Sequence, residues 1–591
     1  MRNNSILNKN YNGKLINEMF RMLLPAQILS TATASLSAVI NGILIGNFLS
    51  DASLVALGFV TPLVSILGAL ASIISGGSRV LCGRFMGQSE IKKLDYVFTG
   101  AMFCAVGLGA VLTLLAQVFA NPLAYILGAR GSFIAETAIY IRGLSLGFIP
   151  SLVIPTLMVL LQMRNESTYS LVSAVVLAAG NLLFSLANIK FFGASLIGMG
   201  FATSLAQYIT VGFLVIKFIT NKSLMRFDMH CFDKLIAKEM VVLGSPTALA
   251  AALYATRNIV LNTLALKVGG DVAVSALAIV MSLTAPLDSL SIGVGAVCLI
   301  LSSVFVGEKD EEAMQDVFKS TIKYGWILAA GQLIVAAILG RPIASLFGAT
   351  GIVLNEAYLV FLIFSMNKPF NIITLAIVNP AQSMGKIKLI NFFYLFNALI
   401  LPLSYTLITL NILGPIAVYS TYATAEVLGL ILIAIYARST YGHFPKNISE
   451  ILMLDKEVFL GNKLTVSIKN MDEVINVSKT IIDFCKENGI DERRSMLAGL
   501  CLEEMAGNVV EHGFTKGKKR DYTIDLFASV QDDDLMLRIR NNTVQFDPVK
   551  AYSPFNPEDP MKNIGIRMVN KLAKEMNYQS SFGMNVLSIK L

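Results

Sequence analysis

The chain has 591 residues, of which 55% are hydrophobic and only 15% carry a charge. Soluble globular proteins carry about 25% charged residues, so this composition excludes an ordinary soluble protein and indicates a membrane protein. Six scattered cysteines without a Cys-x-x-Cys pair argue against a disulfide framework and a zinc site, and three histidines argue against a histidine-rich metal site. The length predicts more than one domain.

Apolar stretches recur from about residue 20 to residue 436. Each is close to the ~20 residues that a helix needs to cross the hydrocarbon core. We therefore predict about twelve transmembrane helices in contact with membrane lipid. The polar first nineteen residues predict no removable signal peptide. We expect no nucleic-acid partner.

Lysine and arginine are unevenly distributed among the short loops. Cytoplasmic loops carry an excess of both residues, which sets the orientation of a membrane protein. With the N-terminus inside, the cytoplasmic loops hold Arg84, Lys92, Lys93, Arg164, Lys217, Lys222, Arg226, Lys234, Lys309, Lys319, Lys386, Lys388, Arg438 and Lys446. The opposite side holds only Arg130, Lys190, Lys267 and Arg341. We predict a multi-pass protein of the cell membrane with both termini in the cytoplasm.

The membrane part repeats itself at a constant offset of 220 residues. The offset aligns Asp51 with Asp271, Gly87 with Gly307, Phe98 with Phe318, and "PLAYILGA" (122–129) with "PIASLFGA" (342–349). This predicts two six-helix lobes in the same orientation, at 15–220 and 235–440. Parallel repeats are typical of transporters, whose substrate site lies between the lobes.

The composition changes abruptly after the membrane part, which predicts a linker at 441–460 and a cytoplasmic α/β-sandwich domain at 461–591. No P-loop occurs, so an ABC-type exporter is excluded. The patterns predict a strand at 463–468, helices at 471–488 and 491–513, strands at 521–530 and 534–541, a loop at 548–562, a helix at 564–576 and a last strand at 584–590.

Several membrane segments resemble the MATE family of multidrug and toxic-compound extrusion antiporters. They include "LLPAQILSTATASLSAVINGILIGNFLSDASLVALGFVTPL", "GRFMGQ", "YIRGLSLGFIP" and "LIGMGFATSLAQ". The resemblance covers about residues 15–440. It implies export of small amphipathic, often cationic compounds by alternating access, driven by an H⁺ or Na⁺ gradient.

The N-terminal lobe departs from that family at the positions of its acidic residues. Members often place one carboxylate in the first helix and another four residues after an Asn in the fifth. Here these positions correspond to Asn41 and, after Asn181, to Ser185. Because Asn and Ser cannot be neutralised by a proton, proton coupling through this lobe is not expected.

The C-terminal lobe carries charges inside apolar segments, namely Arg257, Asp288, Lys368 and Glu426. Such a residue costs roughly 2.5–3.5 kcal/mol at the helix centre, so it faces a partner or a wet cavity. One interpretation is a structural Arg257–Asp288 pair. The other makes Asp288 or Glu426 the titrating group, tuned by Arg257 or Lys368. Lys368 also precedes Pro369, which predicts a broken helix whose free carbonyls line a cavity.

The C-terminal domain contains the stretch "LCLEEMAGNVVEHGF" (500–514), in which Glu504, Asn508 and His512 recur every fourth residue. Residues four apart share one helix face, so the three side chains are expected to converge. Carboxylate and amide oxygens suit Mg²⁺, which takes few protein ligands together with phosphate oxygens.

Four stretches of the C-terminal domain resemble, in this order, the GHKL (Bergerat) ATPase superfamily, and most closely its anti-sigma-factor serine kinases. They are the stretch just described, "LRIRNNTVQFDP" (537–548), "NIGIRMVNKLAKEM" (563–576) and "FGMNVLSIKL" (582–591). The resemblance covers about residues 460–591 and implies ATP as ligand. It makes Glu504 the base, Asn508 the Mg²⁺ ligand, His512 a phosphate contact, Asn541 the adenine contact and Gly565 a support for the phosphates. The family's adenine-reading Asp is Asn541 here, both following glycines are missing, and the first Gly of the G-x-G box is Asn563.

Three functions remain open from the sequence. The first is a cation-coupled exporter of small organic compounds whose tail binds ATP and gates it or phosphorylates a cytoplasmic partner protein. The second is a transporter-derived sensor that controls a serine-kinase-like domain. The third, a lipid-linked precursor flippase, rests only on relatedness to other flippases. The missing N-lobe carboxylates favour the second, and the C-lobe charges favour the first.

Overall fold

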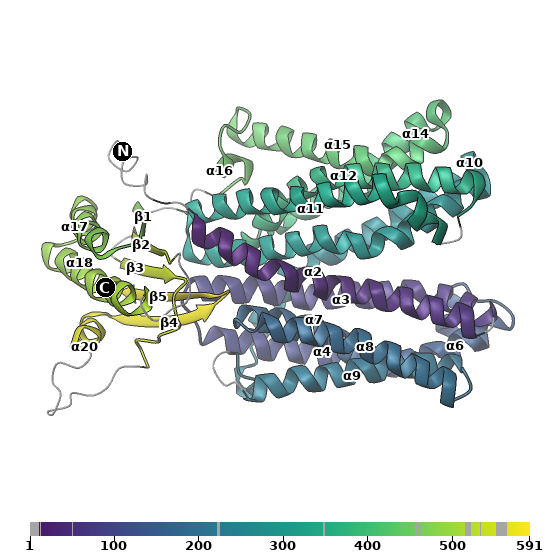
Figure 1. Cartoon of the computed structure of the whole chain (residues 1–591), viewed down its shortest axis with the longest axis horizontal. Helices are drawn as coiled ribbons and strands as arrows, with labels where there is room; N and C mark the ends of the chain where they lie inside the picture. The colour runs from purple at the N-terminus through teal and green to yellow at the C-terminus, as the bar shows by residue number, and fades with distance from the viewer. Residues whose placement is uncertain are drawn as a thin grey trace. The chain divides into compact units, whose positions relative to one another are not determined.

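The computed structural model describes residues 11, 13–49, 51–220, 225–346, 349–455, 458–459, 462–514, 522–531, 534–550 and 564–591. The chain forms two compact units. The larger unit comprises residues 23–162 and 166–454, and the smaller comprises residues 1–22, 163–165 and 455–591. The larger unit is a bundle of long helices, and the smaller contains the sheet (Figure 1).

The first half of the bundle consists of apolar helices of the predicted N-terminal lobe. They are α2 (Lys14–Phe48), α3 (Asp51–Gly87), α4 (Lys93–Val118), α5 (Ala120–Ile126), α6 (Phe133–Ser145), α7 (Phe148–Met163), α8 (Ser167–Phe191) and α9 (Leu196–Thr220). Helices α6 and α7 meet at an angle of 44° and together are long enough for one membrane span.

The second half begins after a short 3-10 turn, η2 (Met229–Cys231). It contains α10 (Lys234–Glu308), α11 (Glu311–Leu346), α12 (Gly351–Ser383), α13 (Ile387–Leu395), the π-helical turn η3 (Phe396–Ile400), α14 (Leu401–Leu413) and α15 (Pro415–Tyr441). Helix α10 has 75 residues, which is far too long for a single crossing of the membrane. It is divided at Gly270, whose φ of 60° and ψ of −156° are not helical.

Among the described residues, nine helices are long and apolar enough to cross a membrane, or ten if the bent pair α6–α7 counts as one span. Helix α2 and the division of α10 at Gly270 account for the remaining two of the predicted segments. The polytopic helical architecture is therefore confirmed.

Each half of the bundle has its own hydrophobic core, and the two cores are built from equivalent positions. Many core residues of the first half correspond to core residues of the second half when 220 is added to their residue numbers. The matched pairs include Ile45 and Ala265, Ala56 and Ala276, Ala124 and Ala344, and Tyr140 and Val360. The predicted repeat is thus a repeat of packing positions.

The smaller unit contains a five-stranded antiparallel sheet with the order β1-β2-β3-β5-β4. The strands are β1 (Asn462–Ile468), β2 (Ile524–Gln531), β3 (Asp534–Asn541), β4 (Glu575–Ser581) and β5 (Met584–Lys590), and the helical segments are α17 (Met471–Glu487), α18 (Glu492–Asn508), the π turn η4 (Val509–Gly513) and α20 (Ile564–Leu572). The α/β class is confirmed. The predicted loop at 548–562 falls mostly outside the described residues.

Alternating strand residues supply the core between the sheet and its helices. Leu464, Val466 and Ile468 of β1 point to this side, as does the odd-numbered apolar row of β3 that ends at Ile539. They pack against α17 and α18, which lie on one side of the sheet (Figure 1). The row continues to Asn541, so this polar side chain faces the same side as the core.

The structure corrects the prediction of a helix at 564–576, because the end of this segment belongs to a strand that the sequence patterns do not predict. Helix α20 ends at Leu572, and Glu575 begins the edge strand β4. Strands β4 and β5 form a hairpin closed by Phe582 and Gly583, whose φ angles are 55° and 73°. Two consecutive residues with positive φ are typical of the tight turn that joins twisted strands.

Candidate functional site

Glu426 on α15 is a buried carboxylate in the C-terminal lobe, with 5% of its surface exposed. Two side chains of α12 bind it: Asn371 Nδ2 donates to Oε1 at 3.0 Å, and Thr374 Oγ1 donates to Oε2 at 2.7 Å. Both hydrogen-bond donors are neutral, and the Glu426 carboxylate forms no ion pair among the described residues. Glu426 is therefore a buried carboxylate whose hydrogen bonds join α12 to α15.

Asp288 and Lys368 form the second charged feature of this lobe. Lys368 Nζ lies 2.5 Å from Asp288 Oδ1 and links α12 to α10. The Asp288 side chain is 37% exposed and that of Lys368 only 10%. The interpretation that paired Asp288 with Arg257 is wrong. The Arg257 guanidinium instead lies over the rings of Tyr254 and Tyr422, at 4.9 and 4.8 Å.

The break predicted at Pro369 is not observed, because α12 continues as a helix from Gly351 to Ser383. Pro369 has no N–H, so the carbonyl of Ser365, four residues earlier, loses its helical hydrogen bond while the helix itself continues. The carbonyl of Pro369 has a side-chain partner as well. Trp326 Nε1 of α11 donates to the Pro369 carbonyl at 3.3 Å. Lys368 is therefore positioned by a continuous helix.

The N-terminal lobe holds a neutral polar cluster at the positions without carboxylates. Asn181 Nδ2 donates to Asn41 Oδ1 at 3.2 Å, Asn41 Nδ2 donates to Thr203 Oγ1 at 3.3 Å, and Thr203 Oγ1 donates to Asn181 Oδ1 at 3.1 Å. The structure thus brings Asn41 and Asn181 together, with Thr203 as a third member that sequence reasoning missed. Ser185, one turn from Asn181, is fully buried, and its Oγ has no hydrogen-bond partner among the described residues.

The two lobes are in close contact at the end of the bundle that is predicted to be cytoplasmic. A Cβ atom at Gly87 would overlap the backbone at Val304, so only glycine allows α3 to approach α10 this closely. Arg84 Nε donates to the Ser383 carbonyl at 2.7 Å and its Nη1 lies 3.5 Å from Glu239 Oε1. These contacts hold the lobes together at this end.

The C-terminal domain contains a cavity of about 560 Å³. Its lining includes Glu504, Asn508, His512, Asn541 and Gly565, the described members of the predicted nucleotide site. Ile539, Ile566, Leu587 and Met505 add apolar walls, and Asn563 lies outside the described residues. Mostly apolar pockets with a few convergent polar groups are typical of cofactor sites.

The row of Glu504, Asn508 and His512 changes its geometry before it reaches His512. Helix α18 ends at Asn508, and the next five residues form the π turn η4. Since a π turn adds a residue, His512 is displaced from the straight row that the α-helical spacing predicts. It still lines the cavity together with Glu504 and Asn508.

Gly565 is in close contact with Glu504. A Cβ atom at position 565 would overlap the Glu504 carboxylate. The absence of a side chain at position 565 therefore leaves room for the Glu504 carboxylate beside the first turn of α20.

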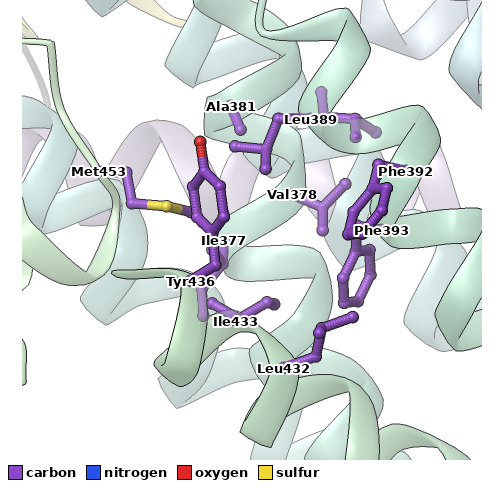
Figure 2. Close-up of a pocket in the computed structure, with 11 residues that line it drawn as sticks. Ile377, Val378, Ala381, Leu389, Phe392, Phe393, Leu432, Ile433, Tyr436 and Met453 are labelled. Carbon is purple, nitrogen blue, oxygen red and sulfur yellow. The ribbon is translucent and has the colours of Figure 1, made fainter. Parts of the chain in front are cut away.

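The linker contacts the C-terminal lobe through a short helix, α16 (Ile448–Ile451). Ser449 Oγ donates to Glu311 Oε1 at 2.5 Å, and Gln315 Nε2 donates to Ser449 Oγ at 2.9 Å. Lys386 Nζ donates to the Met453 carbonyl at 2.6 Å. The Met453 side chain completes a small cavity of about 30 Å³ that is otherwise lined by α12, α13 and α15, including Tyr436 (Figure 2).

The family model described as MatE matches residues 26–172 and 246–408. The chain belongs to the MatE family. A histidine kinase-like ATPase domain model matches residues 469–591 of this MatE chain. The MatE match includes residues of both lobes of the bundle. The ATPase-domain match includes all the residues that line the cavity of the C-terminal domain.

Two curated relatives of this MatE chain are multidrug export proteins. Multidrug export protein MepA of Staphylococcus aureus (strain bovine RF122 / ET3-1) is 24% identical over 376 residues, which is 62% of this chain and 81% of the relative. The protein of that name from Staphylococcus saprophyticus is 22% identical over 335 residues, which is 55% of this chain and 72% of the relative.

Solved structures confirm the fold of the membrane part. A multidrug resistance MATE transporter of the MOP superfamily in an outward-facing conformation has a TM-score of 0.66 at 16% identity, covering 74% of this chain and 98% of that one. A MOP superfamily transporter from Pyrococcus furiosus, described by a binding pocket of reverse polarity, has a TM-score of 0.63 at 18% identity, covering 73% and 97%. The chain is therefore a multi-pass membrane protein with a MATE fold.

Proposed function

We propose that this protein is a cation-coupled exporter of small amphipathic, cationic organic compounds, with both termini in the cytoplasm. The observation that carries the proposal is Glu426, a buried carboxylate bound by Asn371 and Thr374. A buried carboxylate can be neutralised by a bound proton or Na⁺, whereas the N-lobe cluster of Asn41, Asn181 and Thr203 carries no charge that a cation could neutralise. Membership of the MatE family and the similarity to multidrug export proteins support the substrate class.

The C-terminal domain is proposed to bind a purine nucleoside triphosphate together with Mg²⁺. Asn508 and Glu504 offer an amide and a carboxylate oxygen at one wall of the cavity. This donor set suits Mg²⁺ that is held mainly by phosphate oxygens, since the ion takes few protein ligands. Mg²⁺ would neutralise phosphate charge there. Glu504 would accept a proton from a water or hydroxyl nucleophile, and the amides at the start of α20 would hold phosphate oxygens.

We further propose that nucleotide occupancy regulates export through the linker. Ser449, Met453 and Lys386 tie the linker to α11, α12, α13 and α15 of the C-terminal lobe. Any rearrangement of these helices during alternating access therefore changes the contacts of the segment that leads to the nucleotide domain. A cytoplasmic partner protein phosphorylated by the domain would be a second output.

A vesicle assay tests the transport proposal. The protein is reconstituted, an H⁺ or Na⁺ gradient is imposed separately, and export of a fluorescent organic cation is followed. One of the two gradients is expected to drive flux. Absence of gradient-driven flux, with nucleotide binding retained, would instead support a sensor that no longer transports.

Two variants test the nucleotide site. Asn508→Ala is expected to weaken Mg²⁺-dependent nucleotide binding by at least about tenfold, since a protein ligand of the Mg²⁺ ion is lost. Asn476→Ala, on the exposed face of α17, is the matched control and should bind as the wild type does. Unchanged binding in Asn508→Ala would remove this residue from the site.

Regulation is tested by detaching the linker. Met453→Asp places a charge in an apolar cavity, which is unfavourable. We expect nucleotide binding to persist while the effect of nucleotide on flux is lost. Met496→Asp, at an exposed position of α18, is the control. If Met453→Asp keeps normal nucleotide regulation, the linker does not transmit it.

A further inference from the structure

The base-reading position of the proposed nucleotide site, Asn541, has its carbonyl oxygen fully engaged within the protein. Oδ1 accepts hydrogen bonds from Thr543 N at 3.2 Å, Thr543 Oγ1 at 2.7 Å and Asn585 Nδ2 at 3.2 Å. A backbone N–H can only donate, so the atom that faces Thr543 N must be the oxygen of the amide. The contact with the backbone therefore fixes which way this amide points.

Asn585 on the neighbouring strand β5 has an equally defined orientation. Its Nδ2 also donates to the Thr543 carbonyl at 3.0 Å, and its Oδ1 accepts from the Tyr578 hydroxyl at 2.8 Å. Burial is the main cause that raises the pKa of Tyr578, with the nearby Asp547 charge adding to it, so this hydroxyl stays protonated and donates. The amides of Asn585 and Asn541 hold each other in place.

The remaining polar atom of Asn541 is therefore its donor, Nδ2. Asn541 is only 4% exposed and lines the cavity, and no hydrogen bond of its Nδ2 exists among the described residues. This donor faces the cavity, so a ligand that places an acceptor there gains a hydrogen bond, whereas a ligand that places a donor there leaves both groups unpaired. The expectation that Asn541 accepts a hydrogen bond from the adenine amine conflicts with this geometry.

Resting on the proposed nucleotide function, we propose that this cavity prefers a purine with a carbonyl at position 6, that is, a guanine or hypoxanthine nucleotide, over an adenine nucleotide. The 6-carbonyl of guanine is an acceptor and would take the proton of Asn541 Nδ2. The 6-amino group of adenine is a donor, so it would face another donor. The apolar side chains of Ile539, Ile566 and Leu587 accommodate either purine ring.

The test is a competition experiment with the full-length protein in lipid nanodiscs with Mg²⁺. A fluorescent nucleotide is displaced by ATP, ITP and GTP in turn. ITP differs from ATP at position 6, and GTP adds the 2-amino group. We expect ITP and GTP to bind at least about tenfold more tightly than ATP. The ratio is measured in the wild type, so it does not depend on the folding of a variant.

Asn541→Asp supplies the converse test. Its second carboxylate oxygen would be an acceptor toward the cavity, so ATP should gain and ITP should lose affinity, reversing the ratio. Asn476→Asp, which adds the same charge on the exposed face of α17, should leave the ratio unchanged. ATP binding as tightly as ITP to the wild type, or a ratio unaffected by Asn541→Asp, would overturn the base preference while the nucleotide site stands. If no triphosphate binds, the nucleotide function itself is wrong.

Discussion

The two lobes of the membrane bundle share their core positions and differ in their polar chemistry. Ala124 and Ala344 occupy equivalent core positions, as do Ile45 and Ala265. The N-terminal lobe nevertheless has a neutral Asn–Asn–Thr cluster, whereas the C-terminal lobe has a buried Glu426 and a Lys368–Asp288 pair. Packing keeps the repeat because both lobes need the same helix contacts. The charges need not repeat, because in the proposed mechanism only the C-terminal lobe binds the coupling cation.

Glu426→Gln should have the largest effect. The amide keeps the size of the side chain but cannot gain or lose a proton, so gradient-driven export in vesicles is expected to fall by at least about tenfold. Glu136→Gln, in the first turn of α6 in the N-terminal lobe, is the control. Full export by Glu426→Gln would show that the two lobes do not differ in coupling.

Asp288→Asn should lower stability by about 3 kcal/mol, because it leaves the Lys368 ammonium buried without its partner. Lys368→Met should cost less, since the Asp288 side chain is 37% exposed and can retain water. Thermal unfolding in detergent measures both. A double variant more stable than Asp288→Asn alone supports the pair, and additive losses would argue against it.

Ala124→Leu and Ala344→Leu should lower stability to a similar extent, by about 1–3 kcal/mol each, because both overfill a packed core. The comparison uses thermal unfolding of the two variants side by side. Strongly unequal losses would contradict equivalent packing in the two lobes.

Asn181→Ala should have the smallest effect, about 1 kcal/mol of stability, since it removes neutral hydrogen bonds to Asn41 and Thr203. Export should remain within about threefold of the wild type, because no coupling charge is lost. A loss of export as large as that of Glu426→Gln would place a coupling function in this lobe.

The sequence was sufficient for the architecture because the physical signals there are strong. Helices that cross a membrane need about 20 apolar residues, and these runs are visible without any tertiary information. The edge strand β4 was missed because "EMNYQSS" is mostly polar and continues from an amphipathic helix. Its strand conformation depends on pairing with β5, which begins after the two-residue turn Phe582–Gly583.

The hydrogen-bond and ion-pair partners of the site residues were harder to predict than the site residues themselves. The cost of a buried charge marks Asp288 and Lys368 from sequence, but it does not say which cation meets which carboxylate. Asn541 could likewise be placed in the nucleotide site from its motif. The direction of its amide depends on Thr543 and on Asn585, 44 residues later in the chain. Only the register of β3 with β5 brings these side chains together.

The most direct test of the central claim is to measure cation movement upon substrate addition. Vesicles that contain the protein and an internal pH or Na⁺ indicator receive an organic cation, and the flux of H⁺ or Na⁺ is followed. We predict substrate-dependent cation flux in the wild type and in Asn181→Ala, and none in Glu426→Gln. Cation flux that persists in Glu426→Gln but disappears in Asn181→Ala would contradict coupling through the C-terminal lobe.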